Sequence, residues 1–373
     1  MTVRPRPELP DVNRRLLLRA ALLQRAQACR AWEQWRAAGG NIDSVDGQTF
    51  ELLPLVYRSL EAGGVADPDL ARLKGVYRHA WAANQQRANQ IGLALDCLGR
   101  EGIPTMVLGG AAVSVSHYRD LGVRRLDDTA VLVAPRDAER ALSALRACGW
   151  SMRARIEPRR VLRSAHATSL VPSGGDQVWL HWRVLPESIH DEDFWSAAVR
   201  VEVGGVPTLV PGPAQQLLHA CAHDQFFPVS LRWVADAAVV IRSAGLTIDW
   251  ARLVAGASGR EASLRVSTAL SVLVGLLGTP IPDGVMSELQ APPPGGYEQF
   301  ILRLAQKPVR FSSYVWLWKT YHRRVTSGPW PMGGDFLQYV ADMRELPSRR
   351  AIAPMLARRA VALVAGQRQR LSA

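Results

Sequence analysis

Apolar residues recur at helical spacing through the first hundred residues of the chain. Between Asn13 and Trp35 they fall three or four positions apart, which predicts one amphipathic helix that ends at Gly39-Gly40. The same spacing predicts three further helices, Leu52–Glu61, Pro68–Trp81 and Asn84–Arg100. Residues 1–100 are therefore expected to form an N-terminal helical module that packs against the rest of the chain and carries no chemistry.

Alternation of apolar and polar positions replaces this pattern between residues 101 and 210. Gly204-Gly205, between the last two alternating runs, is a two-residue hairpin signal. One helix is expected within the block, from Pro135 to Gly149. The predicted strands are Thr105–Leu108, Thr129–Val133, Trp150–Ile156, Ala167–Val171, Gln177–Trp182, Val199–Val203 and Val206–Val210.

Helical spacing returns over residues 211–280. Asp249 is a plausible N-cap within this segment. The helices expected are Pro213–Gln225, Leu231–Ser243, one that begins near Trp250, and Ser263–Leu277. Residues 281–373 are expected to be a Pro/Gly-rich linker (Pro280–Gly296) followed by a helical region that ends in the basic segment Arg349–Arg370. The fold class is therefore α+β.

The charge changes this picture only slightly. The 373 residues carry a formal net charge of +12, and nearly all of the basic residues are Arg, as a GC-rich genome alone could produce. The remaining excess favours an anionic partner. Basic residues are spread along the chain without a dense tract, so nucleic acid is not an expected partner.

The cysteines and the N-terminus indicate in which cellular compartment the protein is expected. Cys29, Cys97, Cys148 and Cys221 show no CxxC or finger spacing, which argues against a disulfide framework and against structural zinc. No signal peptide is recognisable, and the most apolar window, Val266–Gly278, is too short to span a membrane. A cytoplasmic protein without a membrane span is expected.

The stretch between Thr105 and Pro135 carries the candidate chemistry. Gly109-Gly110 joins a predicted strand to a predicted helix, which suits either phosphate binding or a simple turn. Asp127-Asp128 precedes the next strand, but adjacent aspartates point to opposite faces, so they make a poor metal clamp. Asp128 could instead pair with Arg124 or Arg125 and order the loop.

Histidines supply two further candidates. On the strand Gln177–Trp182, His181 shares a face with Gln177 and Trp179, where it is either a base or ligand or a hydrogen-bonded core residue. His219 and His223 lie four residues apart on one helix, a spacing that can chelate zinc or can serve helix packing.

Several segments together resemble uncharacterised nucleotidyltransferases of the polymerase-β-like superfamily, found in bacterial biosynthetic and polysaccharide gene clusters. The resemblance spans roughly residues 100–280, in the family's order and spacing. It implies a mixed-sheet nucleotidyltransferase core wrapped by helices, and Mg²⁺-dependent transfer of a nucleotidyl group to an acceptor hydroxyl. The matching segments are VLGGAAVSVSHYRDLGVRRLDDTAVLV (107–133), VWLHWRVLPE (178–187), DFW (193–195), VPGPAQQLLHACAHD (210–224), LRWVADAAVVIR (231–242) and IDWARL (248–253).

The metal-binding positions depart from the family pattern, LKGxAL followed by DxDLLV. Gly109 replaces the Lys, Ala130 replaces the second Asp, and Trp179 stands where a third acidic residue is expected. Of the three carboxylates only Asp128 is present. The positions that follow the family are Tyr118, Arg124, His181, Trp182, His223, Trp233 and Asp236.

The expected site combines both lines of reasoning. Asp128 and His181 are the candidate catalytic residues, and Asp128 is also the single candidate metal ligand. The candidate substrate-binding residues are Gly109, Gly110, Tyr118, Arg124, Arg125 and Trp179.

Three functions remain open at this point. The degenerate site could bind or transform an anionic peptide or natural-product intermediate in a biosynthetic pathway, because arginines suit carboxylate and phosphate groups. It could be an active nucleotidyltransferase, which alone of the three requires Mg²⁺ and a nucleoside triphosphate; otherwise no cofactor is expected. It could be a non-catalytic scaffold for a biosynthetic enzyme.

Overall fold

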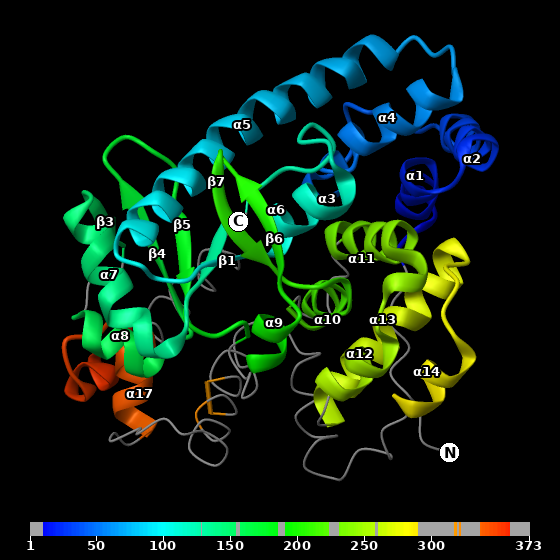
Figure 1. Ribbon diagram of the computed structural model, residues 1–373. Coiled ribbons are helices and arrows are strands. Elements are labelled where there is room, and N and C mark those ends of the chain that lie inside the picture. The colour runs from blue at the N-terminus through cyan, green and yellow to red at the C-terminus, as the bar shows by residue number, and fades with distance from the viewer. Residues whose placement is uncertain are drawn as a thin grey trace, which may run out of the picture.

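The computed structural model describes residues 10–127, 129–153, 157–185, 191–223, 231–257, 260–289, 317–318, 321 and 336–358. Within these residues a seven-stranded mixed sheet has the order β3-β4-β5-β2-β1-β7-β6, with helices around it (Figure 1). The α+β prediction is confirmed. The strands are β1 (Met106–Leu108), β2 (Ala130–Leu132), β3 (Trp150–Met152), β4 (Ala167–Pro172), β5 (Val178–His181), β6 (Val199–Val203) and β7 (Val206–Val210).

Alternation along the central strands gives the sheet two buried faces. Leu108, Ala130 and Leu132 point into the larger core, which contains α1 (Val12–Leu22), α4 (Leu53–Gly63), α10 (Pro213–His223) and α11 (Leu231–Ala244). Val107 and Val131 point into a second core, with α5 (Leu70–Arg100) and α7 (Ala138–Ala147). Both faces are thus covered by helices.

The N-terminal helices differ from prediction in two places. The single helix expected over Asn13–Trp35 is wrong: α1 and α2 (Arg25–Ala37) are separated by extended backbone at Leu23 and Gln24. The break lets the two helices fold against each other and bury Leu18 and Trp32 in one core. The two helices expected over residues 68–100 are instead one continuous helix, α5.

The C-terminal half follows the predicted helices closely. Asp249 caps α12 (Trp250–Gly256), accepting a hydrogen bond from the Arg252 amide at 2.9 Å. The segment expected to be a linker contains a short helix, α14 (Asp283–Glu288), which buries Val285 in the larger core. Residues 290–335 of the expected linker and helical region, apart from 317, 318 and 321, lie outside the described residues, as do residues 359–370 of the basic segment. The remaining helices are α3 (Gly47–Phe50), α6 (Gly109–Val113), α8 (Pro158–Ser164), α9 (Glu192–Ser196), α13 (Arg260–Leu277) and α17 (Phe336–Met343).

Two cysteines that the sequence separates by 51 residues are joined. Cys97 near the end of α5 and Cys148 just after α7 form a disulfide, which the argument from cysteine spacing did not predict. Packing of α5 against α7 brings them together, which no local spacing reveals. Because disulfides are typical of oxidising compartments, the cysteine argument for a reducing cytoplasm no longer holds.

Helix length and hydropathy bear on the membrane prediction. None of the helices in the described ranges combines the length and apolar character needed to cross a bilayer.

Two glycines of α5 should respond in opposite ways to alanine. A Cβ on Gly92 would lie 2.8 Å from the Gly204 carbonyl oxygen of the β6–β7 turn, whereas a Cβ on Gly75 meets nothing within 4 Å. We expect Gly92→Ala to destabilise the protein by roughly 1–3 kcal/mol, because backbone must move. Gly75→Ala, the matched control, should stabilise it by about 0.5–1 kcal/mol. Urea unfolding of both variants measures the difference, and equal responses would contradict the close packing at Gly92.

Candidate functional site

A buried ion pair holds the loop between α6 and β2 against α11. The Arg124 guanidinium donates to both carboxylate oxygens of Asp236, from Nε at 2.8 Å to Oδ1 and from Nη2 at 2.9 Å to Oδ2. Both side chains are only 8% exposed. The Tyr118 hydroxyl also donates to Asp236, at 3.1 Å. This bidentate pairing occupies the face of Arg124 that would otherwise be offered to a ligand.

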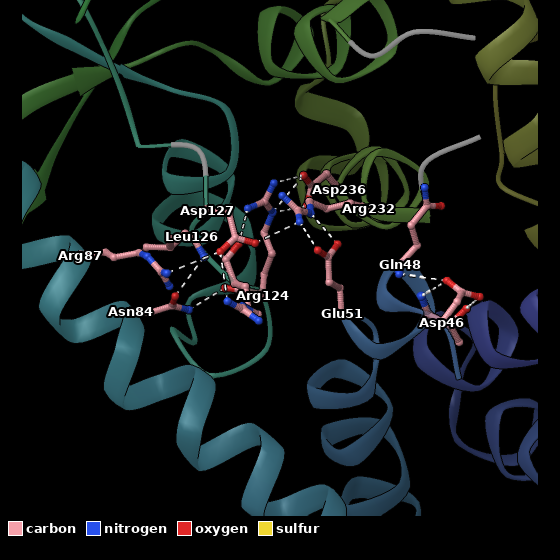
Figure 2. Close-up of polar contacts among 12 residues, drawn as sticks. Asp46, Gln48, Glu51, Asn84, Arg87, Arg124, Leu126, Asp127, Arg232 and Asp236 are labelled. Atoms are coloured by element: carbon pink, nitrogen blue, oxygen red, sulfur yellow. Dashed lines mark hydrogen bonds and ion pairs between the residues drawn. The ribbon is translucent and has the colours of Figure 1, made fainter. Parts of the chain in front are cut away.

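The same loop is anchored from the other side by α5 (Figure 2). The Asn84 side chain, fully buried, donates from Nδ2 to the carbonyl oxygens of Leu121 and Arg124 at 2.5 and 2.6 Å. Its Oδ1 accepts from the Leu126 amide at 2.9 Å. One side chain therefore satisfies three backbone groups of an irregular loop, which fixes the approach to β2.

Asp127 ends this loop among three arginines. Its carboxylate lies 3.1 Å from Arg232, 3.5 Å from Arg125 and 3.6 Å from Arg87, nitrogen to oxygen. Arg232 is also paired with Glu51. Figure 2 shows the side chains of Arg87, Asp127 and Arg232 converging from α5, the loop and α11. A basic cluster thus surrounds one internal carboxylate beside the start of β2.

The strand register places two of the positions that depart from the family pattern, Ala130 and Trp179, next to each other. β2 and β5 are parallel neighbours, and Ala130 lies opposite Trp179. Thr129, just before β2, is buried and donates its hydroxyl to the Gln177 carbonyl at 2.7 Å. A methyl group and an indole therefore stand side by side at adjacent positions of the two strands, and Thr129 is committed to the backbone.

The glycine turn after β1 has a structural explanation at each residue. Gly109 has a φ of +60°, a conformation that favours glycine. Gly110 lies so close to Arg124 that a Cβ would be 1.8 Å from Nη1 and 2.1 Å from Cζ. The absence of a side chain at Gly110 is therefore what allows the Arg124–Asp236 pair to form in its present place.

The comparisons with known proteins agree with this architecture. The family described as uncharacterised nucleotidyltransferase matches residues 48–278, more than half of the chain. The chain belongs to this family. A comparison with curated proteins finds no match. The family match covers α4 to α13, so both the sheet and the arginine cluster lie inside it.

A two-metal centre for nucleotidyl transfer needs carboxylates on neighbouring strands. In this nucleotidyltransferase-family chain, Ala130 and Trp179 offer no oxygen at those positions, so the described residues there do not fit a two-metal centre. Asp128, the one carboxylate expected, lies outside the described residues. Across the described ranges, no group of three or more His, Cys, Asp or Glu residues is arranged to hold a metal ion.

The histidines lie in separate surroundings. His181 is buried at the end of β5, with its ring 5.4 Å from that of His166 and 6.5 Å from that of Trp179, between centroids. His219 on α10 is buried near Gly109. The side chain of His223 lies outside the described residues, so the proposed histidine pair stays a prediction.

Burial sets the protonation of two groups in the larger core. Burial, reinforced by the charge of Asp236, raises the pKa of Tyr118 well above its ordinary value of 10, so its hydroxyl keeps the proton that it donates to Asp236. Burial also raises the pKa of the Cys221 thiol to about 12. Cys221 is therefore a protonated, unreactive packing residue at neutral pH.

A small pocket adjoins the arginine loop between α3, α4 and α11. The residues that line it include Glu51, Tyr118, Arg124, Arg125, Arg232 and Asp236. Three of the predicted substrate-binding residues, Tyr118, Arg124 and Arg125, are therefore brought together here. Gly110 touches the same group through Arg124, whereas Trp179 and His181 lie on β5.

Sequence reasoning missed several residues that build this site. Asn84, Arg87, Glu51 and Arg232 were not singled out. For Asn84 a signal exists: it falls on the buried stripe of α5 between Ala80 and Ala88, where a polar residue needs partners. For Glu51 and Arg232, which are 181 positions apart in the sequence, the contact depends on tertiary structure alone.

Proposed function

We propose that this nucleotidyltransferase-family protein binds an anionic ligand, a peptide or natural-product intermediate, beside the arginine loop, and does not carry out two-metal nucleotidyl transfer. The observation that carries the proposal is the register pair of Ala130 and Trp179. The metal ions of such enzymes supply several kcal/mol of transition-state stabilisation. A methyl group and an indole supply no ligand for them.

The basic residues around the loop support the anionic character of the ligand. Arg125 and Arg232 line the small pocket and are partly exposed, so they are accessible to a charged group from solvent. Guanidinium groups match the geometry of carboxylate and phosphate. Arg124, by contrast, supports the pocket wall through its pair with Asp236.

Calorimetry tests the loss of metal-dependent chemistry. Titration of the wild-type protein with ATP or GTP plus Mg²⁺ should give no Mg²⁺-dependent heat, and a labelled nucleotide should not be transferred to any acceptor tried. Ala130→Asp should introduce measurable Mg²⁺ binding, because it restores one carboxylate next to the loop. Ser151→Asp, on the exposed face of β3, is the matched control and should introduce none.

Two results would count against the proposal. Mg²⁺-dependent nucleotide binding with label transfer by the wild-type protein would show an active nucleotidyltransferase. Full product formation in the producing pathway by a variant that lacks both Arg125 and Arg232 side chains, when deletion of the gene abolishes the product, would favour a scaffold instead.

A further inference from the structure

Within the described part of the chain, two arginines beside Asp127 contact its carboxylate only at ion-pair distances longer than a normal hydrogen bond. The Arg87 side chain is only 18% exposed, yet its contacts are ion pairs of 3.6 Å to Asp127 and 3.7 Å to Asp176, too long for hydrogen bonds. Its Nη1 is buried and has no hydrogen-bond partner among the described residues. A buried donor left unpaired is costly, so its retention calls for an explanation.

Arg125 shows the same feature from the opposite side of the carboxylate. Its guanidinium lies 3.5 Å from Asp127, again beyond hydrogen-bond distance, and is 36% exposed. Arg232 does reach Asp127 with a hydrogen bond of 3.1 Å, while also holding Glu51. Charge-assisted hydrogen bonds normally have a donor–acceptor distance of 2.7–2.9 Å. The Asp127 carboxylate, the one acidic group of the described residues that contacts all three arginines, thus fits between them loosely.

A tetrahedral dianion would fit the cluster better than a carboxylate. A phosphate monoester carries about −1.5 to −2 charges at pH 7 and three acceptor oxygens, enough to engage several guanidinium groups at once. Asp127 has one charge and two oxygens to share among three arginines. Two other carboxylates contact the cluster from its edges: Glu51 pairs with Arg232, and the exposed Asp176 lies 3.7 Å from Arg87. Its side chain belongs to a partly exposed loop end, so it can turn towards solvent when a stronger anion arrives.

We propose that Arg87, Arg125 and Arg232 form a binding site for the phosphate group of a phosphomonoester, and that Asp127 occupies this site as an internal anion until the ligand displaces it. This inference rests on the proposed function, of which it specifies the ligand class. The phosphate is bound as a recognition group, and no bond to it is made or broken.

Substitution of the internal anion gives the sharpest test. Inorganic phosphate and O-phosphoserine are titrated into the full-length protein by calorimetry, with acetate as the carboxylate probe. Asp127→Asn keeps the shape and removes the charge, so it should bind both phosphate probes about tenfold more tightly than wild type. Arg87→Gln and Arg125→Gln should each weaken binding about tenfold. Arg136→Gln, an exposed arginine on the first turn before α7, should leave binding unchanged.

Circular dichroism melts of each variant separate lost binding from lost folding. If neither wild type nor a folded Asp127→Asn variant binds phosphate, the inference is overturned. Equal affinity for acetate and phosphate would also overturn it, while the proposal of an anionic ligand would stand. ATP, tested with and without Mg²⁺, distinguishes a nucleotide from a smaller phosphomonoester: Mg²⁺-dependent ATP binding with transfer would instead defeat the proposed function.

Discussion

Replacing Asp236 with alanine should destabilise the protein by roughly 3–5 kcal/mol, because Arg124 would be left as a buried charge without its partner. The Tyr118 hydroxyl would lose its acceptor at the same time. Urea unfolding followed by circular dichroism gives the free energy of unfolding directly.

An exposed ion pair of the same residue types supplies the control. Asp96 pairs with Arg100 four residues along α5, and both side chains are about half exposed or more. Asp96→Ala should therefore cost no more than about 1 kcal/mol. A loss at Asp236 as small as that at Asp96 would show that the buried pair is not needed to hold the loop.

Gly110→Ala should be nearly as damaging as the loss of Asp236. The new methyl group would overlap the Arg124 guanidinium, and this side chain cannot move aside without leaving Asp236. We expect a loss of roughly 3–5 kcal/mol in the free energy of unfolding, as for any change that breaks a buried ion pair.

The double variant distinguishes this mechanism from ordinary overpacking. If both changes act through the same ion pair, Gly110→Ala combined with Asp236→Ala should cost much less than the sum of the two. Gly99→Ala, at an open position of α5 where a Cβ meets nothing within 4 Å, serves as the glycine control. Additive losses, or a harmless Gly110→Ala, would contradict the account of the glycine turn.

The strands could be predicted from the sequence because their signals are local, whereas their order in the sheet could not. Alternation and the Gly204-Gly205 turn gave the β6–β7 hairpin with its correct bounds. The break between α1 and α2 could not be predicted in this way. Helical spacing continues through Leu23 and Gln24, so only the packing of α1 against α2 reveals the turn there.

Individual residues of the site could be predicted from the sequence, but the contacts between them could not. The sequence indicates Gly110 and Arg124 as substrate-binding candidates, whereas it indicates Asp236 only as a position that follows the family. Their mutual contact depends on a loop meeting a helix more than 100 positions later. Contacts between side chains that far apart in the sequence produce no periodic pattern. The roles of these residues therefore become apparent only in the folded structure.

The composition of the larger core has a consequence for how the chain is made. Leu17, Leu132 and Leu289 belong to the same buried cluster, so its first and last contributors are separated by most of the polypeptide. At ribosomal speeds of about 5–20 residues per second, on the order of 15 to 55 s pass between synthesis of the first and the last. During that interval the apolar faces of the N-terminal helices cannot yet pack against the later parts of this core. We therefore expect chaperones at the ribosome exit to bind these helices.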